Sequence, residues 1–486
     1  MLSENLTDTE FIASKVLWFL KQTPEEFMAH IRANPRDSFH SIPNPKNGSM
    51  IIVGREAGQR FWQIAERHLA SHSDRKARTH LGAFVDQLRT TFSQLFLQEG
   101  REINQSTVDR WISIAYRATA RAHEPATHFI PCALVFTDSL HEFTVGPVTF
   151  YYESEFFRRY GPEIEKLRQT IRDRHRKRVE EAIDKGFPVE NAATPEQSAQ
   201  WGDHLTDGLL ESFKRYRWFA VVNVPASDKK VSYDLALFAT RGALNIIKLL
   251  FGSDYTHRLR TADDYGHAEK SARLSRGADG ELHVSLSSTP TDHVVGDEWL
   301  KKLNTAGRFF TLPCRVLTLC SGFDPAPPLC SRYLDALSWL GDAVAERAPA
   351  AKIVKYVTAI ERICGTGIEK DETGKERGVT DIVTNRAAII YSTITDISFD
   401  QARKEVAKLY DCRSDVVHGS VSPFDDKIAA QVAKADEVTR MVLLGAIDFY
   451  HSVGLEEPAN NEKGLRGHFQ KLEKWNADGR PQPPQP

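Results

Sequence analysis

The spacing of hydrophobic residues predicts a mainly helical first part of the chain, covering residues 1–125. Within the segment 80–98, hydrophobic residues recur at the intervals of three and four that place them on one face of a helix. They are Leu81, Phe84, Val85, Leu88, Phe92 and Leu95. A second amphipathic run covers 108–120. We therefore expect helices joined by loops in this part of the chain.

The hydrophobic pattern changes over residues 126–295. In 127–154, β-branched and aromatic runs are interrupted by Asp-Ser and Gly-Pro, which is typical of short strands joined by turns. Segments 218–226 and 281–288 are also predicted strands, whereas 233–252 is predicted to be a strongly apolar helix. Together they indicate an irregular α+β region, which we interpret as a sensor or regulatory part.

A charge-dense helix is predicted inside this region, over 161–185. Its basic residues gather in 172–178, which invites a nucleic-acid interpretation. Acidic residues follow at once, at Glu180 and Glu181. A solvated helix with ion pairs between successive turns explains the same pattern and is favoured. A linker is expected over 188–200.

The remainder of the chain is predicted to be helical. Candidate helices cover 298–319, 328–346, 350–364, 380–395, 399–417 and 425–451. We assign 296–455 to one helical domain and 456–486, which is polar and then Pro-rich, to a poorly ordered tail. The predicted fold class is an α+β N-terminal region followed by an all-α C-terminal helical bundle.

Charge and cysteine content narrow the class of protein. Lys plus Arg (63) nearly balances Asp plus Glu (65) in the 486 residues, which argues against a protein that permanently coats DNA. A local basic groove for RNA remains compatible with that balance. The six cysteines form no CxxC pair, so a structural zinc site is not expected and a reduced, intracellular protein is.

The sequence contains no pattern that indicates a targeting signal or a cofactor site. The N-terminus carries acidic residues where a signal peptide is basic, and its apolar run is too short to span a bilayer. A cytoplasmic protein without membrane contact is the expectation. The glycine-rich segment 365–378 lacks the spacing of a phosphate loop, and neither GxSxG nor a GxGxxG after a strand occurs. We expect no cofactor and no metal.

The predicted helix 399–417 carries the most informative residues. Ser398 and Gln401 form a capping-box pattern at its start, and an apolar stripe follows. The stripe consists of Ala402, Val406, Leu409, Val416 and Val417. Arg413 falls on this stripe, where a guanidinium is costly unless a partner, an interface or a site meets it.

His418 stands at the predicted end of this helix, which Gly419 and Pro423 mark. Five residues correspond to about 140° of rotation, so Arg413 and His418 do not share a face of a straight helix. They converge only if the helix ends near Val417, or if each completes a site with the copy in a second subunit.

The segment 409–420, LYDCRSDVVHGS, resembles the signature of HEPN domains, in particular the Apea-like HEPN family. That signature has a tyrosine, then Arg-Ser, two apolar residues and His-Gly. Segment 352–364 resembles the first helix of the family and ends near the acidic Glu361, and 379–392 resembles the second, with Arg386. The resemblance covers about 330–452.

The resemblance implies a helical bundle that forms a homodimer and cleaves RNA without a metal ion. Arg413 and His418 of both subunits would line one cleft, with Ser414 and Asp415 beside them and Glu361 and Arg386 as possible support. His418 would act as general base or acid in attack of a ribose 2′-OH on the adjacent phosphate, and Arg413 would hold that phosphate. The products would carry 2′,3′-cyclic phosphate and 5′-OH ends.

The resemblance also implies a biological setting, in which the chain is an effector or toxin of antiviral, abortive-infection defence. A phage-derived trigger would act on the N-terminal region. This chain departs from the catalytic pattern at Ser414, where Asn, Asp or His is frequent, and Ser420 replaces the tyrosine of toxins silenced by modification.

Two other interpretations of the same residues stay open. One is a non-catalytic RNA- or nucleotide-binding module that uses Arg413, Lys404, Lys408 and Arg386 for phosphate. The other is a purely structural dimerisation domain. There Arg413 pairs with Glu361 or Asp415, and His418 caps the helix C-terminus, where a cation is favourable.

Overall fold

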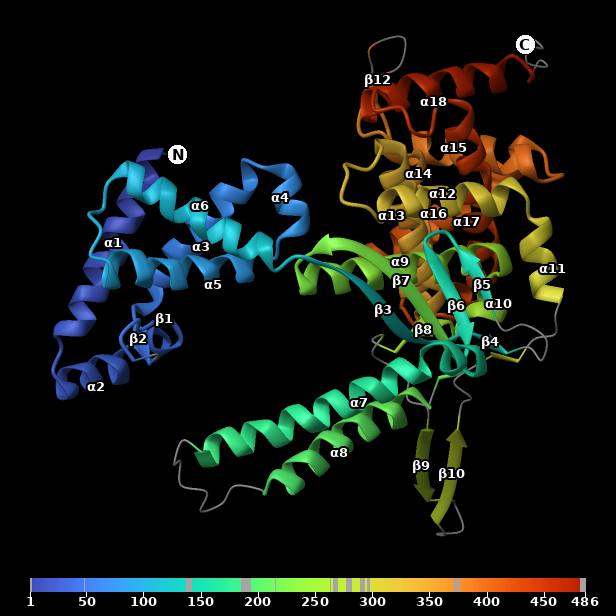
Figure 1. Ribbon diagram of the computed structural model, residues 1–486. Helices are drawn as coiled ribbons and strands as arrows, with labels where there is room; N and C mark the ends of the chain where they lie inside the picture. The colour runs from blue at the N-terminus through green and yellow to red at the C-terminus, as the bar shows by residue number, and fades with distance from the viewer. Residues whose placement is uncertain are drawn as a thin grey trace. The chain divides into compact units, whose positions relative to one another are not determined.

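The computed structural model describes residues 2–47, 49–136, 142–184, 194–214, 216–262, 264, 270–276, 282–288, 293–294, 298–370, 374 and 376–480. The chain is mostly helical and divides into two units (Figure 1). The N-terminal unit comprises Met1–Thr127 and Asn223–Ala236, and the C-terminal unit comprises His128–Val222 and Leu237–Pro486.

The N-terminal unit is built mainly from helices. Its elements are α1 (Leu2–Lys21), α2 (Pro24–Ala33), the short helix η1 (Pro35–Phe39), β1 (Ser41–Pro43), β2 (Met50–Ile52), α3 (Gly54–Ala70), α4 (Ser73–Arg78), α5 (Leu81–Phe92), the π-helix η2 (Ser93–Gln98) and α6 (Gln105–Arg121). Thr23 and Glu26 form a reciprocal capping box at α2, and Asn104 caps α6. The predicted helices 80–98 and 108–120 are confirmed as α5 with η2 and as α6.

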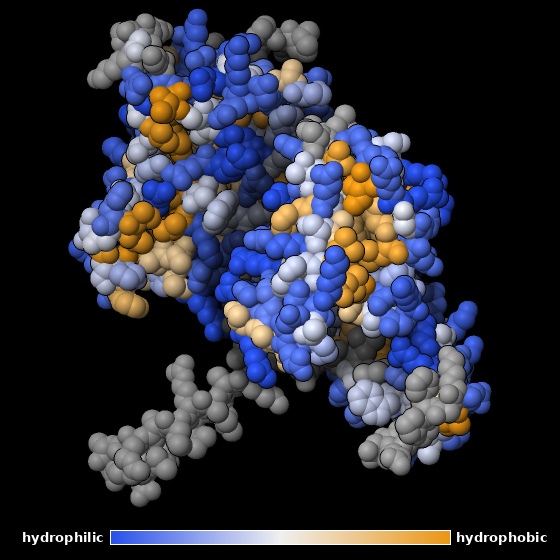
Figure 2. All heavy atoms as spheres, turned by 90° about the vertical axis from the view of Figure 1, so that its left-hand side faces the viewer, coloured by the Kyte–Doolittle hydropathy of each residue, from blue (hydrophilic) through white to orange (hydrophobic). Residues whose placement is uncertain are grey.

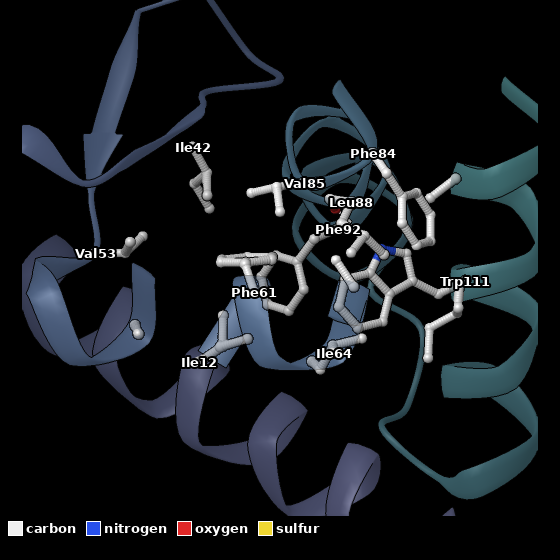
Figure 3. Close-up of a cluster of buried hydrophobic side chains, with 14 of the residues drawn as sticks. Ile12, Ile42, Val53, Phe61, Ile64, Phe84, Val85, Leu88, Phe92 and Trp111 are labelled. Carbon is white, nitrogen blue, oxygen red and sulfur yellow. Dashed lines mark hydrogen bonds between the residues drawn. The ribbon is translucent and has the colours of Figure 1, made fainter. Parts of the chain in front are cut away.

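A cluster of buried hydrophobic side chains, several of them aromatic, forms the core of this unit, and Figure 3 shows it. Phe61 of α3, Phe92 of α5 and Trp111 of α6 meet edge to face, with ring centroids 5.6 to 6.1 Å apart. The indole N–H of Trp111 donates to the carbonyl of Leu88 at 3.0 Å, so its one polar atom is satisfied inside the core. These three side chains are fully buried, and their contacts hold α3, α5 and α6 together.

Some large hydrophobic side chains of this unit lie outside its core. The face shown in Figure 2 is mainly hydrophilic, with hydrophobic side chains gathered in patches. In α1, Ile12 and Val16 are fully buried, whereas Leu17 and Leu20 are about half exposed. Helix α1 therefore has an apolar face directed to the core and a further apolar surface at its C-terminal end.

The sheet of the C-terminal unit has five strands in the order β5-β6-β7-β3-β8. Their bounds are β3 Glu124–Ala133, β5 Glu142–Val145, β6 Val148–Tyr152, β7 Trp218–Ser227 and β8 Arg260–Thr261. Strands β6 and β7 pair antiparallel, with Phe150 opposite Ala220. The predicted strands in 127–154 and over 218–226 are confirmed by β3, β5 and β6 and by β7, although a helix already begins at Glu153 and residues 137–141 lie outside the described residues. Burial alternates along β5, as expected for a strand with one face in the core.

The other described strands form two-stranded sheets, and β1 with β2 is one of them. Strand β9 (Lys270–Arg276) pairs with β10 (Leu282–Ser288), and β11 (His293–Val294) pairs with β4 (Val135–Phe136). Strand β12 (Glu369–Lys370) pairs with β13 (Glu376–Arg377). The predicted strand 281–288 is confirmed over Leu282–Ser288, and its first residue lies outside the described residues.

A pair of long helices follows the strand β6. Helix α7 (Glu153–Asp184) packs against α8 (Pro195–Phe213), and Figure 1 shows them side by side. Lys177 lies 3.8 Å from Glu181 one turn later, which is the type of ion pair that the favoured interpretation expects, whereas Arg168 pairs with Asp203 and Asp207 of α8. The expected linker 188–200 is wrong from residue 195 on, where α8 begins, and 188–193 lie outside the described residues.

Helices make up the rest of the C-terminal unit. They are α9 (Lys229–Phe251), α10 (Ser253–Thr256), α11 (Glu298–Thr305), α12 (Arg308–Cys320), α13 (Pro328–Ala345), α14 (Pro349–Cys364), α15 (Val379–Ile394), α16 (Phe399–His418), α17 (Asp426–Ser452) and α18 (Glu462–Ala477). The predicted helix 298–319 is two helices, because Gly307 adopts a left-handed φ of 55° between them. The other predicted helices from 328 to 451 are confirmed within two residues at each end.

Buried tyrosines tie the helices that position the candidate site. Tyr356 of α14 donates to Asp436 of α17 at 2.9 Å, and Tyr450 of α17 donates to the carbonyl of Ile363 at 2.7 Å. Helix α16 packs against both α14 and α15. Residues of α14 and α16 that are far apart in the sequence therefore lie side by side.

The chain end differs from the expected poorly ordered tail. Within 456–486, residues Glu462–Ala477 form α18, which Asn461 caps. Leu465 and Phe469 of α18 are buried, so this stretch belongs to the folded unit. Residues 481–486, the Pro-rich end, lie outside the described residues.

The fold class agrees with the prediction in its coarse form, a mixed α+β region followed by a helical part. The all-α description needs one correction, because the β12–β13 hairpin interrupts the helical part. Among the helices whose residues are described, none combines the length and the apolar character needed to cross a bilayer.

Candidate functional site

Helix α16 is fixed at both ends by local hydrogen bonds. The Ser398 hydroxyl accepts from the backbone N–H of Gln401 at 3.2 Å, but the Gln401 side chain turns to Glu405, so only half of the predicted capping box forms. At the other end Gly419 has φ 71°, and the N–H of Ser420 donates to the carbonyl of Asp415 at 2.9 Å. The helix therefore continues through His418 before it stops.

Arg413 is held on the inner side of α16 by a carboxylate of α14. A guanidinium nitrogen of Arg413 lies 3.6 Å from Glu361, and both side chains are about one quarter exposed. The guanidinium carbon also lies 5.9 Å from the ring centre of Tyr410. Of the two partners left open by the sequence, Glu361 rather than Asp415 forms the ion pair.

Tyr410 completes a three-residue cluster with Glu361 and Arg413. Its hydroxyl donates to the second oxygen of Glu361 at 2.5 Å. Burial, and then the hydrogen bond and negative charge of Glu361, raise the pKa of Tyr410 to about 12. Tyr410 is therefore protonated near neutral pH and donates to the carboxylate, which leaves the other Glu361 oxygen for Arg413.

The guanidinium of Arg413 is incompletely satisfied in this cluster. Its Nε is buried and has no hydrogen-bond partner among the described residues. The 3.6 Å approach to Glu361 is longer than a good charge-assisted hydrogen bond. Arg413 thus keeps donor capacity for a further anionic group, and 27% of its side chain is open to solvent.

His418 does not join Arg413 within one chain. The helix runs without interruption between the two residues, which leaves them about 140° apart around its axis. The possibility that an early helix end brings them together is therefore wrong. The His418 side chain is exposed and makes neither a hydrogen bond nor an ion pair with any residue that the structure describes.

The exposed face of α16 that carries His418 also carries lysines and carboxylates. Helical geometry places Lys404, Lys408, Asp411, Asp415 and His418 within about 80° of one another, opposite Arg413. All five side chains are exposed. This face is mixed in charge, with two lysines near the start of the helix and the histidine at its end.

The side chains of Ser414 and Asp415 form no hydrogen bond or ion pair with the residues that the structure describes. Ser414 is half-buried and Asp415 is exposed, and only the backbone of Asp415 takes part in ending the helix. The predicted apolar stripe also stops earlier than expected. Val406 is buried, but Val417 is 51% exposed, because the last turn of α16 extends past the helices that cover it.

Arg386 lies in a buried ion-pair network away from the surface. Its side chain is 0% exposed and donates to both oxygens of Glu369 at 2.7 and 2.9 Å and to Glu473 at 2.6 Å. It also donates to the Thr366 hydroxyl and to the carbonyl of Cys364. With every donor direction occupied, Arg386 has no free donor for a phosphate.

The network that occupies Arg386 was missed by the sequence analysis. Glu473 comes from α18, in the stretch expected to be disordered, and it also accepts from Arg377 at 2.7 Å. The signal was present, because Leu465 and Phe469 are spaced as one face of a helix that begins after Asn461. Tyr410 was seen only as part of a motif, and its bond to Glu361 crosses 49 residues of sequence.

No group of three or more His, Cys, Asp or Glu side chains within the described ranges is placed to hold a metal ion. The site that the structure does assemble consists of Arg413, Glu361 and Tyr410, with His418 on the outer face of the same helix.

No protein-family model, no curated protein and no solved structure matches the chain.

Proposed function

We propose that the chain is a metal-independent endoribonuclease of the HEPN type, with Arg413 and His418 at a site formed by two subunits. The observation that carries the proposal is the state of Arg413. Its guanidinium is held by one carboxylate at 3.6 Å, keeps an unpartnered Nε, and belongs to the same helix as the exposed His418. The resemblance of 409–420 to the Apea-like HEPN signature supplies the reaction class.

The proposed reaction is an attack within the RNA strand that moves the phosphoryl group from the 5′-oxygen of the next nucleotide to the neighbouring 2′-oxygen. The ribose 2′-oxygen attacks the adjacent phosphorus, and His418 accepts the proton of the 2′-hydroxyl. The bond to the 5′-oxygen breaks, and this leaving oxygen takes up the proton from the His418 imidazolium. The strand thus separates into a 2′,3′-cyclic phosphate end and a 5′-hydroxyl end. Histidine suits both proton transfers because it titrates near neutrality when unperturbed.

Arg413 would act on the phosphate in this scheme. A guanidinium stabilises the negative charge that develops on the phosphoryl oxygens, and its planar donors fit them in pairs. Glu361 and Tyr410 would position Arg413 without touching the substrate. The Tyr410 hydrogen bond fixes the carboxylate, and the carboxylate limits the directions in which the guanidinium can turn.

The geometry of α16 is the reason for proposing a homodimer. Arg413 and His418 of one chain lie on different sides of the helix, so one copy does not present both to the same phosphate. A second copy brought against the end of α16 supplies the missing group. Val417 and Phe424, which are 51% and 92% exposed, provide apolar surface for such a contact.

The biological setting is proposed by resemblance alone. The helical part would be the effector of an antiviral, abortive-infection response in the cytoplasm, and the N-terminal part would respond to a phage-derived trigger. The sequence of events would be recognition by the N-terminal part, followed by RNA cleavage.

The experiment is incubation of the purified protein with total cellular RNA in EDTA. Wild type is compared with Arg413→Ala, His418→Ala and the control His451→Ala, which removes another exposed histidine near a helix end. We expect cleavage by wild type and His451→Ala only, with cyclic phosphate ends. Equal cleavage by His418→Ala, or complete dependence on added metal, would overturn the proposal.

A non-catalytic RNA- or nucleotide-binding module is the alternative. The observation in its favour is that Lys404 and Lys408 are exposed on the His418 face and have no ion-pair partner among the described residues. Retention of RNA by the folded protein without any cleaved product, weakened in Lys404→Ala/Lys408→Ala, would favour it. Loss of stability alone in Arg413→Ala would instead favour a structural role for its ion pair with Glu361.

A further inference from the structure

The N-terminal unit contains a pocket that the proposed nuclease does not use. Its volume is about 600 Å³, and its lining comes from α1, α2, η1 and the start of α3. Pockets that hold small molecules usually measure about 300 to 1,000 Å³. The space therefore suits one compact ligand and is too small for a folded partner.

An aromatic side chain forms one wall of this pocket. Trp18 is 41% exposed, although its ring meets Phe19 and His30 edge to face at 4.8 and 4.9 Å between centroids. These contacts hold the indole in place and leave part of its surface uncovered. A fixed, partly uncovered indole is a platform on which a planar ring can stack.

Hydrogen bonds fix the polar floor of the pocket. His30 Nε2 lies 2.8 Å from one oxygen of Asp37, and the other oxygen accepts from the backbone N–H of Arg55 at 2.8 Å. Gly54, with φ 79°, brings the chain so close that a Cβ there would lie 3.2 Å from Phe19. Asp37 thus occupies the N-terminus of α3 itself, and each of its carboxylate oxygens has a hydrogen-bond partner.

Two cations at the rim are left for a ligand. Arg55 is exposed and, over the described ranges, its guanidinium has no ion-pair partner. Lys15 lies 3.4 Å from Glu56, but the two side chains are 39% and 69% exposed, and surface pairs of this kind contribute little. An anionic group can therefore displace Glu56 from Lys15 at small cost and bind between Lys15 and Arg55.

We propose that this pocket binds a single nucleotide, with its base against Trp18 and its phosphate between Lys15 and Arg55. The volume accommodates one base, one sugar and one phosphate. His30 and Asn34 add hydrogen-bonding groups beside the aromatic wall. The same chemistry is offered by a free mononucleotide and by the 5′-phosphorylated end of an RNA strand. The proposal is independent of cleavage at Arg413 and His418.

The test is a calorimetric titration of the full-length protein, freed of bound nucleic acid. The probes are the four ribonucleoside 5′-monophosphates, the matching nucleosides, and a short single-stranded oligoribonucleotide with a 5′-phosphate. We expect saturable binding of one nucleotide per chain, weakened about tenfold when the phosphate is absent. Binding of monophosphates identifies a free nucleotide as the ligand, and binding of the oligonucleotide alone identifies a strand end.

The variants separate this pocket from a general affinity for RNA. Trp18→Ala is expected to weaken binding about tenfold or more, as loss of base stacking does, whereas Trp18→Phe keeps most of the affinity. Arg55→Ala is expected to weaken binding of the monophosphate about fivefold and leave nucleoside binding unchanged. Arg121→Ala, an exposed arginine of the same unit, serves as the control and is expected to bind like wild type.

His418→Ala is expected to bind nucleotides like wild type, which keeps this result separate from that of the nuclease assay. Two results would overturn the pocket proposal. One is the absence of binding by protein that circular dichroism shows to be folded. The other is binding that Trp18→Ala and Arg55→Ala leave at the wild-type level.

Discussion

The hydroxyl of Tyr410 donates a 2.5 Å hydrogen bond to Glu361, the carboxylate that also faces Arg413. This bond links α16 to α14 across 49 residues of sequence. It fixes one carboxylate oxygen and leaves the other to the guanidinium. The orientation of Arg413 therefore depends on a neutral tyrosine that is itself 8% exposed.

Replacement of Glu361 tests this dependence. Glu361→Ala leaves the buried Tyr410 hydroxyl without an acceptor and is expected to lower the free energy of unfolding by about 1–3 kcal/mol. Glu361→Gln keeps an acceptor and is expected to cost less. Both variants are expected to lower RNA cleavage about 10- to 100-fold, because the guanidinium loses its fixed position.

Urea unfolding and the EDTA cleavage assay measure the two effects, with exposed Glu376→Ala as the control. Unchanged cleavage by Glu361→Gln would show that the carboxylate does not position Arg413.

The Arg386 network is expected to dominate the stability of the C-terminal unit. Arg386→Met removes the bidentate partner of Glu369, which is 2% exposed, and leaves Glu473 with Arg377 alone. Breaking a buried pair in this way costs about 3–5 kcal/mol. Arg386→Lys is expected to recover little, because one ammonium does not reach four separate acceptors. Urea unfolding measures the loss.

Arg403 provides the comparison for Arg386. It pairs with Asp381, and both side chains are more than half exposed. Arg403→Ala is therefore expected to change the free energy of unfolding by less than about 1 kcal/mol. Similar losses for the Arg403 and Arg386 variants would mean that the buried network contributes no more than a surface pair.

The sequence predicted the helices from 328 to 451 well because their ends carry strong local signals. Ser398 caps α16, and Gly419 ends it in a left-handed conformation. Where such signals were passed over, the prediction failed. Gly307 divides a predicted single helix, and the Pro-rich end of the chain drew attention from the helical spacing of Leu465 and Phe469.

The candidate site could be located from the sequence, but its contacts could not. An arginine on an apolar stripe requires a partner, and the sequence left both Glu361 and Asp415 open. Only packing of α14 against α16 selects Glu361. For the same reason Arg386 was named as possible support for the site, and as a phosphate ligand only in the binding-module alternative. Its partners Glu369 and Glu473 come from a hairpin and a helix that local patterns do not connect.

Surface substitutions next to His418 test the proposed homodimer. Phe424 is 92% exposed, so Phe424→Asp is expected to change the free energy of unfolding by no more than about 0.5 kcal/mol. If Phe424 lies in a subunit interface, the buried carboxylate would shift the protein to monomers and abolish cleavage. Light scattering after size-exclusion chromatography gives the mass.

The control is Phe39→Asp, at a residue of the N-terminal unit that is 80% exposed, and it is expected to stay dimeric. A Phe424→Asp dimer that still cleaves RNA would exclude this surface from the active assembly.

The histidine His68 is expected to make the stability of the N-terminal unit depend on pH. Burial, and then the charges of His72 and Arg75, lower the pKa of His68 to about 4. Its ring packs between Phe84 and Tyr116, which is why the charged form is disfavoured in the folded chain.

The direction of this pH dependence follows from the lowered pKa. Above pH 6.5 the imidazole is neutral in both states, and the folded unit keeps its full stability. As the pH falls from 6.5 towards 4, the unfolded chain binds a proton that the folded unit does not, and stability is lost. The loss is complete below about pH 4 and, because solvent screens part of the charge of this half-buried ring, amounts to about 1–2 kcal/mol. Urea unfolding at pH 7 and pH 4.5 is expected to show a larger loss for wild type than for His68→Gln, which does not titrate. The difference between the two proteins isolates His68, because every other titrating group is common to both. Equal losses would mean that the folded unit accommodates the protonated ring.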